Sequence, residues 1–148
     1  YSTKNYKMKK ILIINSNFYK IISKNLIINA KKKLIHTKYS TSKIDVPGVF
    51  EIPIAIRKNI RKFDAFIALG CVIKGETPHF DLICSSTFNA ILSLSIDFNK
   101  PIGNGIITAL NMSQAINRSK KKTSKKTNKG SEAADAVISI LNNEPKKI

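Results

Sequence analysis

One stretch of the chain, LGCVIKGETPHFDLIC at positions 69–84, combines residue types suited to proton transfer and to anion binding. Its apolar run ends at Ile73, a polar turn follows, and a segment with apolar periodicity begins at His79. This order predicts a strand, a turn and a helix. His79 is one of only two histidines, and an imidazole exchanges protons near neutral pH. We interpret His79 as a candidate acid–base group; the alternative is a solvated ring at a helix start.

The turn before His79 is also a candidate anion site. Glu76 and Thr77 follow a glycine where the free N–H groups and the dipole of the predicted helix favour negative charge. The Thr77 hydroxyl adds a donor, whereas Glu76 suits a phosphate only if its side chain points away. The turn is not a P-loop, because the pattern GxxxxGK[ST] is absent. A phosphate site is therefore one interpretation of this turn.

Arg118 stands out among the cations. It is one of three arginines among many lysines, and a guanidinium suits bidentate contact with phosphate. The alternative is an ordinary residue on a helix surface. For Lys129 the same two interpretations remain open, namely contact with phosphate and an ordinary position on a helix surface.

Aromatic residues in or beside turns are candidates for ring stacking. Phe18 follows the first apolar run, and Phe50 lies in the loop VPGVFE. A phenylalanine at the end of a strand could stack on a planar ring, or could plug the core. Glu51 could accept hydrogen bonds from ligand hydroxyls, or could favour a helix N-terminus by its charge.

The elements that position these residues follow from the apolar pattern. Three apolar runs predict buried parallel strands at 10–15, 64–73 and 101–108, and a weaker alternation predicts another strand at 34–39, with His36 at a strand edge. Apolar periodicity predicts helices at 20–33, 53–60, 79–98 and 113–118, and a last helix led by 128–131. Strands that alternate with helices imply a parallel sheet covered on both faces.

Finer features of these elements can also be predicted. Ser113 is the expected N-cap of its helix, and two glycines in the strand at 101–108 indicate close approach of a ligand or of another backbone. The expected core stripe of the helix at 79–98 is Leu82, Ile83, Thr87, Ala90, Ile91 and Leu94. That of the last helix is Ala133, Val137, Ile140 and Leu141.

Length and composition restrict the class of protein. A chain of 148 residues with 43% hydrophobic residues suits one domain with a single core. No apolar run approaches the roughly 20 residues that span a bilayer, so we expect no membrane partner. The two cysteines, Cys71 and Cys84, form neither a CxxC pair nor a histidine cluster, which argues against a metal and favours a reducing, cytoplasmic compartment.

The net charge of +17 does not by itself predict a nucleic-acid partner. Of the 26 basic residues 23 are lysines, and isoleucine and asparagine are also abundant. These three residue types have A/T-rich codons, so a biased genome explains much of the charge. We expect no nucleic-acid partner, and we interpret the run 120–126 as a solvated loop.

The two ends are expected to lie outside the domain. Residues 1–7 are polar and precede Met8, which looks like a natural start, and we interpret residues 1–8 as a disordered extension. The segment is too short and too polar for a secretory signal. Residues 9–143 then form a single domain, with a frayed tail at 144–148.

Three motifs together resemble the 6,7-dimethyl-8-ribityllumazine synthase family. They are VPGVFEIPIA at 46–55, ALGCVIKGETPHFD at 68–81 and NKGSEAA at 128–134, and the resemblance extends over 9–142. It implies a flavodoxin-like three-layer α/β/α sandwich with a four-stranded parallel sheet. It also implies condensation of 5-amino-6-(D-ribitylamino)uracil with 3,4-dihydroxy-2-butanone 4-phosphate, without metal or organic cofactor. Pentamers with active sites between subunits are implied as well.

The resemblance assigns roles to matching positions. His79 matches the general acid/base. The turn at Glu76 and Thr77 matches the phosphate site, and Arg118 matches its cationic partner from the adjacent subunit. Contacts to the pyrimidine and its ribityl chain are implied for Phe18, Val49, Phe50, Glu51, Cys71, Val72, Ile73 and Lys129. A protein that only binds a flavin-like ring would not need the phosphate residues, so the resemblance favours an enzyme.

Two positions depart from the family pattern. Asn104 stands at a substrate-facing position where many members carry phenylalanine, so the backbone contact can persist while an aromatic wall is lost. The connection after Arg118 is longer and more basic than in many members. We therefore expect pentamers or decamers rather than shells of 60 subunits.

Overall fold

The central sheet of the computed structural model, which describes residues 7–120 and 128–148, is formed by four parallel strands. They are β1 (Lys10–Ser16), β2 (Ser40–Val46), β3 (Ala65–Ile73) and β4 (Ile102–Ala109), in the order β2-β1-β3-β4. The inner strands β1 and β3 are almost wholly buried, as their continuous apolar runs predict. The prediction of a four-stranded parallel sheet is confirmed.

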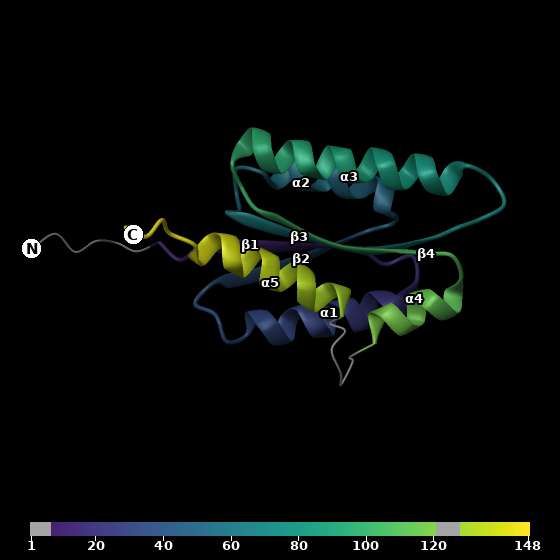
Figure 1. The fold of residues 1–148 in the computed structure, drawn as a ribbon, viewed down its shortest axis with the longest axis horizontal. Helices are drawn as coiled ribbons and strands as arrows, with labels where there is room; N and C mark the ends of the chain where they lie inside the picture. The colour runs from purple at the N-terminus through teal and green to yellow at the C-terminus, as the bar shows by residue number, and fades with distance from the viewer. Residues whose placement is uncertain (1–6, 121–127) are drawn as a thin grey trace, which may run out of the picture.

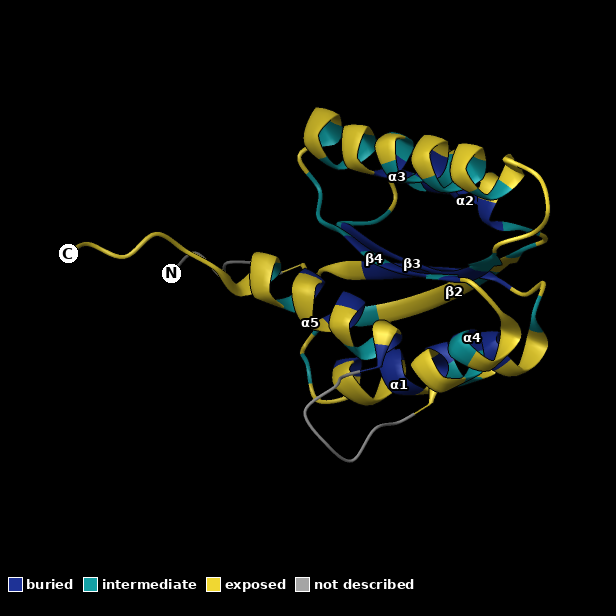
Figure 2. Ribbon diagram, turned by 45° about the vertical axis from the view of Figure 1, so that its right-hand side comes forward, coloured by how far each residue is buried: buried dark blue, intermediate teal, exposed yellow. Residues whose placement is uncertain are grey.

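Helices cover both faces of this sheet (Figure 1). One layer holds α1 (Lys20–Leu34), α4 (Met112–Ser119) and α5 (Lys129–Asn142). The other holds the 3₁₀ turn η1 (Val49–Glu51), α2 (Ile52–Asn59) and α3 (His79–Phe98). The result is the three-layer α/β/α sandwich that we expected, and Figure 2 shows the buried strands between the two helical layers. Across the two described ranges, no helix is long and apolar enough to cross a bilayer.

The common direction of the four strands places the loops of interest at one edge of the sheet. Because all four strands run parallel, the segments after β1, β2, β3 and β4 all leave from the carboxyl edge. These segments carry Phe18, the 3₁₀ turn η1, the turn before His79 and the start of α4. Figure 1 shows these connections at the right-hand side, while both termini lie at the opposite side.

The predicted strand at 34–39 is wrong. Helix α1 continues to Leu34, a turn follows, and the strand is β2, with the polar sequence STSKIDV. The Thr37 hydroxyl donates to the Leu34 carbonyl oxygen at 2.7 Å and so closes the end of α1. His36 lies exposed in this turn rather than at a strand edge. Since β2 is an outer strand and largely exposed, its sequence lacks the apolar alternation that predicts a strand.

Smaller corrections concern the start of α4 and the two core stripes. The N-cap of α4 is Asn111, whose side chain accepts from the Gln114 backbone N–H at 2.9 Å, and not Ser113. Thr87 and Ile91 are buried as expected, but Leu82 of α3 and Ile140 of α5 are exposed by 64% and 59%. Apolar periodicity does not distinguish a face covered by the chain's own core from one left open. The predicted loop at 120–126 lies, except for Lys120, outside the described residues.

One of the two glycines of β4 meets the backbone of α5, and the other meets the neighbouring strand β3. A Cβ atom at Gly103 would lie 2.3 Å from the Ala133 carbonyl oxygen, and one at Gly105 would lie 2.6 Å from a methyl carbon of Leu69. Of the two interpretations that the sequence left open, close approach of another backbone therefore holds at Gly103. This approach seats α5 directly on the sheet.

We expect Gly103→Ala to destabilise the fold by about 2–3 kcal/mol, because the backbone of α5 would have to move. Gly75→Ala is the control, since no atom lies within 4 Å of a Cβ there, and its effect should stay within about 0.5 kcal/mol. Urea unfolding of the two variants measures the difference. Equal midpoints would show that α5 does not depend on this contact.

Candidate functional site

A cleft of about 550 Å³ opens at the carboxyl edge of the sheet. Its walls come from the ends of β1 and β3, from η1 and from the start of α3. The residues that line it are Ser16, Phe18, Tyr19, Gly48, Val49, Phe50, Cys71, Val72, Ile73, His79 and Ile83. Seven of the candidate residues thus come together from four segments that are distant in the sequence.

Two exposed aromatic side chains flank this cleft. Phe18 is 71% exposed and Phe50 is 62% exposed, so neither plugs the core. Phe18 also contacts Tyr19 edge to face, with ring centroids 4.9 Å apart. Burying two exposed phenylalanine rings is favourable, so this surface is a candidate for contact with a partner or a flat ligand.

The floor of the cleft holds a thiol that is not poised to react. Cys71 is buried and free, and burial, with a smaller contribution from Cys84, raises its pKa to about 11. Burial, followed by the charge of Cys71, also raises the pKa of Tyr19. A thiol that stays protonated at neutral pH is a poor nucleophile, so Cys71 serves as an apolar surface.

His79 opens α3 at the rim of the cleft. The helix follows Pro78, which has no side-chain cap bond, and the Thr77 hydroxyl accepts from the His79 backbone N–H at 3.4 Å. Glu76, Thr77 and His79 are all exposed. Thus the imidazole is accessible to a ligand, and the positive end of the helix dipole lies beside it.

Glu51 lines a neighbouring hollow between α2 and α3, which shares Phe50 with the cleft. This hollow measures about 400 Å³, and its other lining residues are Pro53, Ile54, Ser86, Thr87 and Ala90. The hydroxyl of Thr87 is buried there without a hydrogen-bond partner in the described structure. Glu51 therefore faces a space next to the cleft.

Three candidate residues lie away from the cleft in the same chain. The side-chain oxygen of Asn104 accepts from the Ile106 backbone N–H at 3.0 Å, within the outer strand β4. Arg118 of α4 donates to the Thr108 carbonyl oxygen at 2.7 Å. Lys129 pairs with Glu132 at 3.5 Å. All three belong to β4, α4 or α5, and none of the described residues that line the cleft is a lysine or an arginine.

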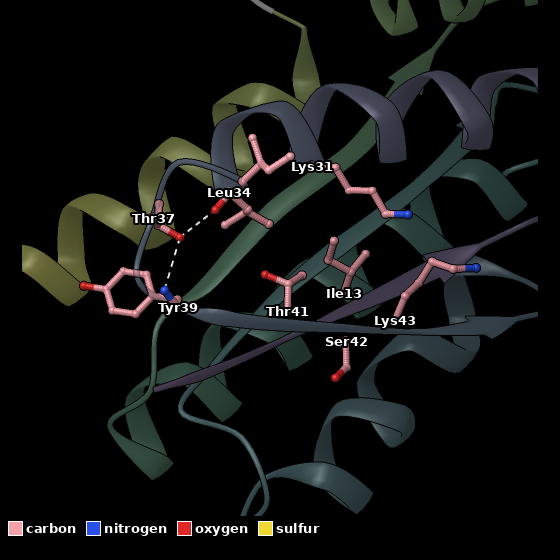
Figure 3. A pocket seen from close by; sticks show the side chains of 9 residues that line it. Ile13, Lys31, Leu34, Thr37, Tyr39, Thr41, Ser42 and Lys43 are labelled. Atoms are coloured by element: carbon pink, nitrogen blue, oxygen red, sulfur yellow. Dashed lines mark hydrogen bonds between the residues drawn. The ribbon is translucent and has the colours of Figure 1, made fainter. Parts of the chain in front are cut away.

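Another hollow, of about 450 Å³, lies between the end of α1 and the outer strand β2 (Figure 3). Thr41 and Lys43 point to its α1 side, whereas Ser42 points to the other face of the strand. None of the candidate residues lines it. Within 7–120 and 128–148, no group of three histidine, cysteine or acidic residues is placed to hold a metal ion.

Four residues of the cleft were not among the candidates, namely Ser16, Tyr19, Gly48 and Ile83. Ser16 and Tyr19 flank Phe18 at the end of the first strand, and Gly48 belongs to the motif VPGVFE. Their position beside a candidate aromatic is the signal that could have identified them. Ile83 lies one helical turn after His79, and periodicity assigned it to the core.

Comparison with known proteins identifies one family. The model of the 6,7-dimethyl-8-ribityllumazine synthase family matches residues 8–144. A protein of that name from Campylobacter jejuni subsp. doylei is 42% identical over 138 residues, which cover 90% of this chain and 88% of the relative. Its namesake from Zymomonas mobilis is 39% identical over 137 residues, or 91% of this chain and 96% of the relative. The one from Bartonella tribocorum is 38% identical over 138 residues.

Proposed function

Because the chain belongs to the 6,7-dimethyl-8-ribityllumazine synthase family, we propose that it condenses 5-amino-6-(D-ribitylamino)uracil with 3,4-dihydroxy-2-butanone 4-phosphate. The family places the chain among the transferases of riboflavin biosynthesis. The observation that carries the proposal for this chain is the cleft that brings Phe18, Phe50 and His79 together. We propose the cytoplasm as its compartment, in keeping with two free cysteines.

The cleft suits the pyrimidine substrate. The exposed rings of Phe18 and Phe50 offer apolar faces to a heterocycle, and the end of β3 from Cys71 to Ile73 offers backbone groups to its polar edge. Glu51, in the adjoining hollow, is placed to accept hydrogen bonds from a hydroxylated side chain. The pyrimidine would then lie with its reacting amine towards the rim.

His79 at the rim suits the proton transfers. The pyrimidine's amine attacks the ketone carbonyl, water leaves to give an imine, and phosphate is then eliminated before the ring closes with loss of a second water. Each step moves a proton, and an exposed imidazole can accept and return it. Much of the acceleration would come from holding the two substrates face to face.

The phosphate requires a positively charged group, and the described part of one chain places none in the cleft. The turn at Glu76 and Thr77 and the start of α3 supply backbone N–H groups, but among residues 7–120 and 128–148 no lysine or arginine lines the cleft. A departing phosphate is best stabilised by a guanidinium or an ammonium group. We therefore propose that Arg118 and Lys129 reach the cleft from a second copy of the chain, with Asn104 of that copy beside them.

The surface around the cleft supports such an assembly. Large apolar side chains are exposed on η1, α2 and α3, namely Phe50, Ile54, Leu82, Leu92 and Ile96. Exposed apolar patches of this kind mark sites of association. The family implies a homo-oligomer, and we propose pentamers or decamers rather than 60-subunit shells, because a large positive charge on each subunit opposes a crowded shell.

Incubation of the protein with both substrates tests the reaction directly. We expect the absorbance and fluorescence of the lumazine to appear, and phosphate to be released in equal amount. Omitting either substrate is the control. Unchanged substrates after incubation with folded, oligomeric protein would reject the proposed activity.

Arg118→Ala should raise the KM for the butanone phosphate by about tenfold, because a charge-assisted contact to phosphate is lost. The KM for the pyrimidine should change little. Arg61→Ala, an exposed arginine beyond the end of α2, is the matched control. Steady-state kinetics with each substrate varied in turn measure both constants. Equal rises in the two constants would contradict the phosphate role.

His79→Ala should lower kcat by up to about 100-fold, which is the low end of what positioned acid–base groups contribute. Turnover should persist, because the two substrates are still held together. The control is His36→Ala, which removes the other histidine from the turn after α1. If His79→Ala turns over as fast as the unaltered enzyme, His79 has no part in proton transfer.

A further inference from the structure

A set of hydrogen-bonded side chains joins α1, α4 and α5 in the layer opposite α3. We call it the polar node, and its members are Asn25, Asn29, Ser119, Asn128 and Ser131. Asn29, Ser119 and Asn128 are buried, with exposed fractions of 6%, 0% and 3%. Buried polar groups that are fully bonded fix the elements that carry them.

Asn128 uses both ends of its amide within this node. Its oxygen accepts from the backbone N–H groups of Gly130 at 2.7 Å and Ser131 at 3.3 Å, and so caps α5. Its nitrogen donates to the carbonyl oxygen of Ser119, at the end of α4, and lies 3.5 Å from that of Lys120. One side chain therefore ties the end of α4 to the start of α5, on the two sides of residues 121–127.

Helix α1 holds both ends in place. The Asn25 amide donates to the Ser119 hydroxyl at 3.1 Å, and the Ser131 hydroxyl donates to the Asn29 carbonyl oxygen at 3.4 Å. A Cβ atom at residue 130 would lie 2.4 Å from the Leu26 carbonyl oxygen, so only glycine lets α5 start this close to α1. The polar node thus ties the end of α4 and the start of α5 to α1.

Two exposed cations adjoin this buried tie. Arg118 immediately precedes Ser119, and Lys129 immediately follows Asn128. We propose that Asn128 is a positioning residue, which fixes the backbones that carry Arg118 and Lys129 relative to each other, so that the two cations bind one phosphate group together. The inference rests on the proposed function of Arg118, and adds that the two cations act as a unit set by a buried amide that touches no substrate.

Asn128→Ser separates this role from helix capping. Serine caps a helix about as well as asparagine, but it has no amide nitrogen to reach the carbonyl of Ser119. Asn111→Ser is the matched control, because Asn111 is the N-cap of α4 and accepts from Gln114 without any tie to α5. Asn25→Ala is a second variant, which keeps the cap of α5 and loses only the bond to Ser119.

We expect Asn128→Ser to weaken binding of inorganic phosphate, measured by titration calorimetry, by about tenfold. The KM for the butanone phosphate should rise to a similar extent. The KM for the pyrimidine should rise less, because of the two cations only Lys129 is expected to contact that substrate. Asn111→Ser should bind phosphate as tightly as the unaltered protein. If Asn128→Ser does not fold, Asn25→Ala replaces it in the test, and we expect it to weaken phosphate binding to a smaller extent.

Unchanged phosphate binding in folded Asn128→Ser, or in Asn25→Ala when the first variant does not fold, would overturn the inference. Equal loss for both substrates would also overturn it, because a general loosening of the fold has no preference for phosphate. The proposed function is tested separately. Suppose that the unaltered protein forms no lumazine but that Asn128→Ser still weakens phosphate binding. The proposed reaction would then be rejected, and the positioning role of Asn128 would stand.

Discussion

Burial of β1 and β3 on both faces is the constraint on which the rest of the structure depends. Two strands with apolar side chains on either side must be covered by helices on both faces. Here helices connect each strand to the next strand along the chain, and all four strands run parallel. All connections that leave the strands then meet at one edge. Phe18, η1 and the turn before His79 follow the carboxyl ends of β1, β2 and β3, so they must lie at this edge and form the cleft there. The location of the cleft therefore follows from the packing of the core.

The same constraint divides the cations from the cleft. The chain crosses the sheet between α3 and α4, so Arg118 and Lys129 belong to the layer of α1, whereas His79 belongs to the layer of α3. Within one chain, α4 and α5 therefore lie on the other side of the sheet from His79. A second copy that lays its α4 and α5 against the exposed face of α3 would meet both needs, since it covers apolar side chains and delivers positive charge.

Elements with continuous apolar runs can be predicted from the sequence. Predictions are less accurate for elements that are only partly buried. The inner strands and α3 were placed almost to the residue, and the motifs around Phe50 and His79 identified most of the cleft. The position of β2 is not predicted correctly, because this outer strand has no buried face and its sequence, STSKIDV, lacks apolar alternation. Leu82 and Ile140 were assigned to the core because periodicity records an apolar face without recording what covers it. The role of Asn128 depends on three helices meeting, which no local pattern contains.

Net charge does not identify which lysines and arginines have a function. The hydrogen bonds and the burial of the residues beside each cation are more informative. A chain with 26 basic residues offers many solvated lysines, and a biased composition explains their number. Lys100 shows that an anchored cation can be purely structural, because its ammonium group donates to the carbonyl oxygens of Ile60 and Phe63 at the end of α2. Arg118 and Lys129 also have partners, the Thr108 carbonyl oxygen and Glu132, but they differ from Lys100 in their exposure. Their side chains are exposed, while the residues beside them, Ser119 and Asn128, are buried and bonded to each other. An accessible charge on an immobile backbone is the arrangement that binds an anion at low entropic cost, because little motion is left to lose on binding.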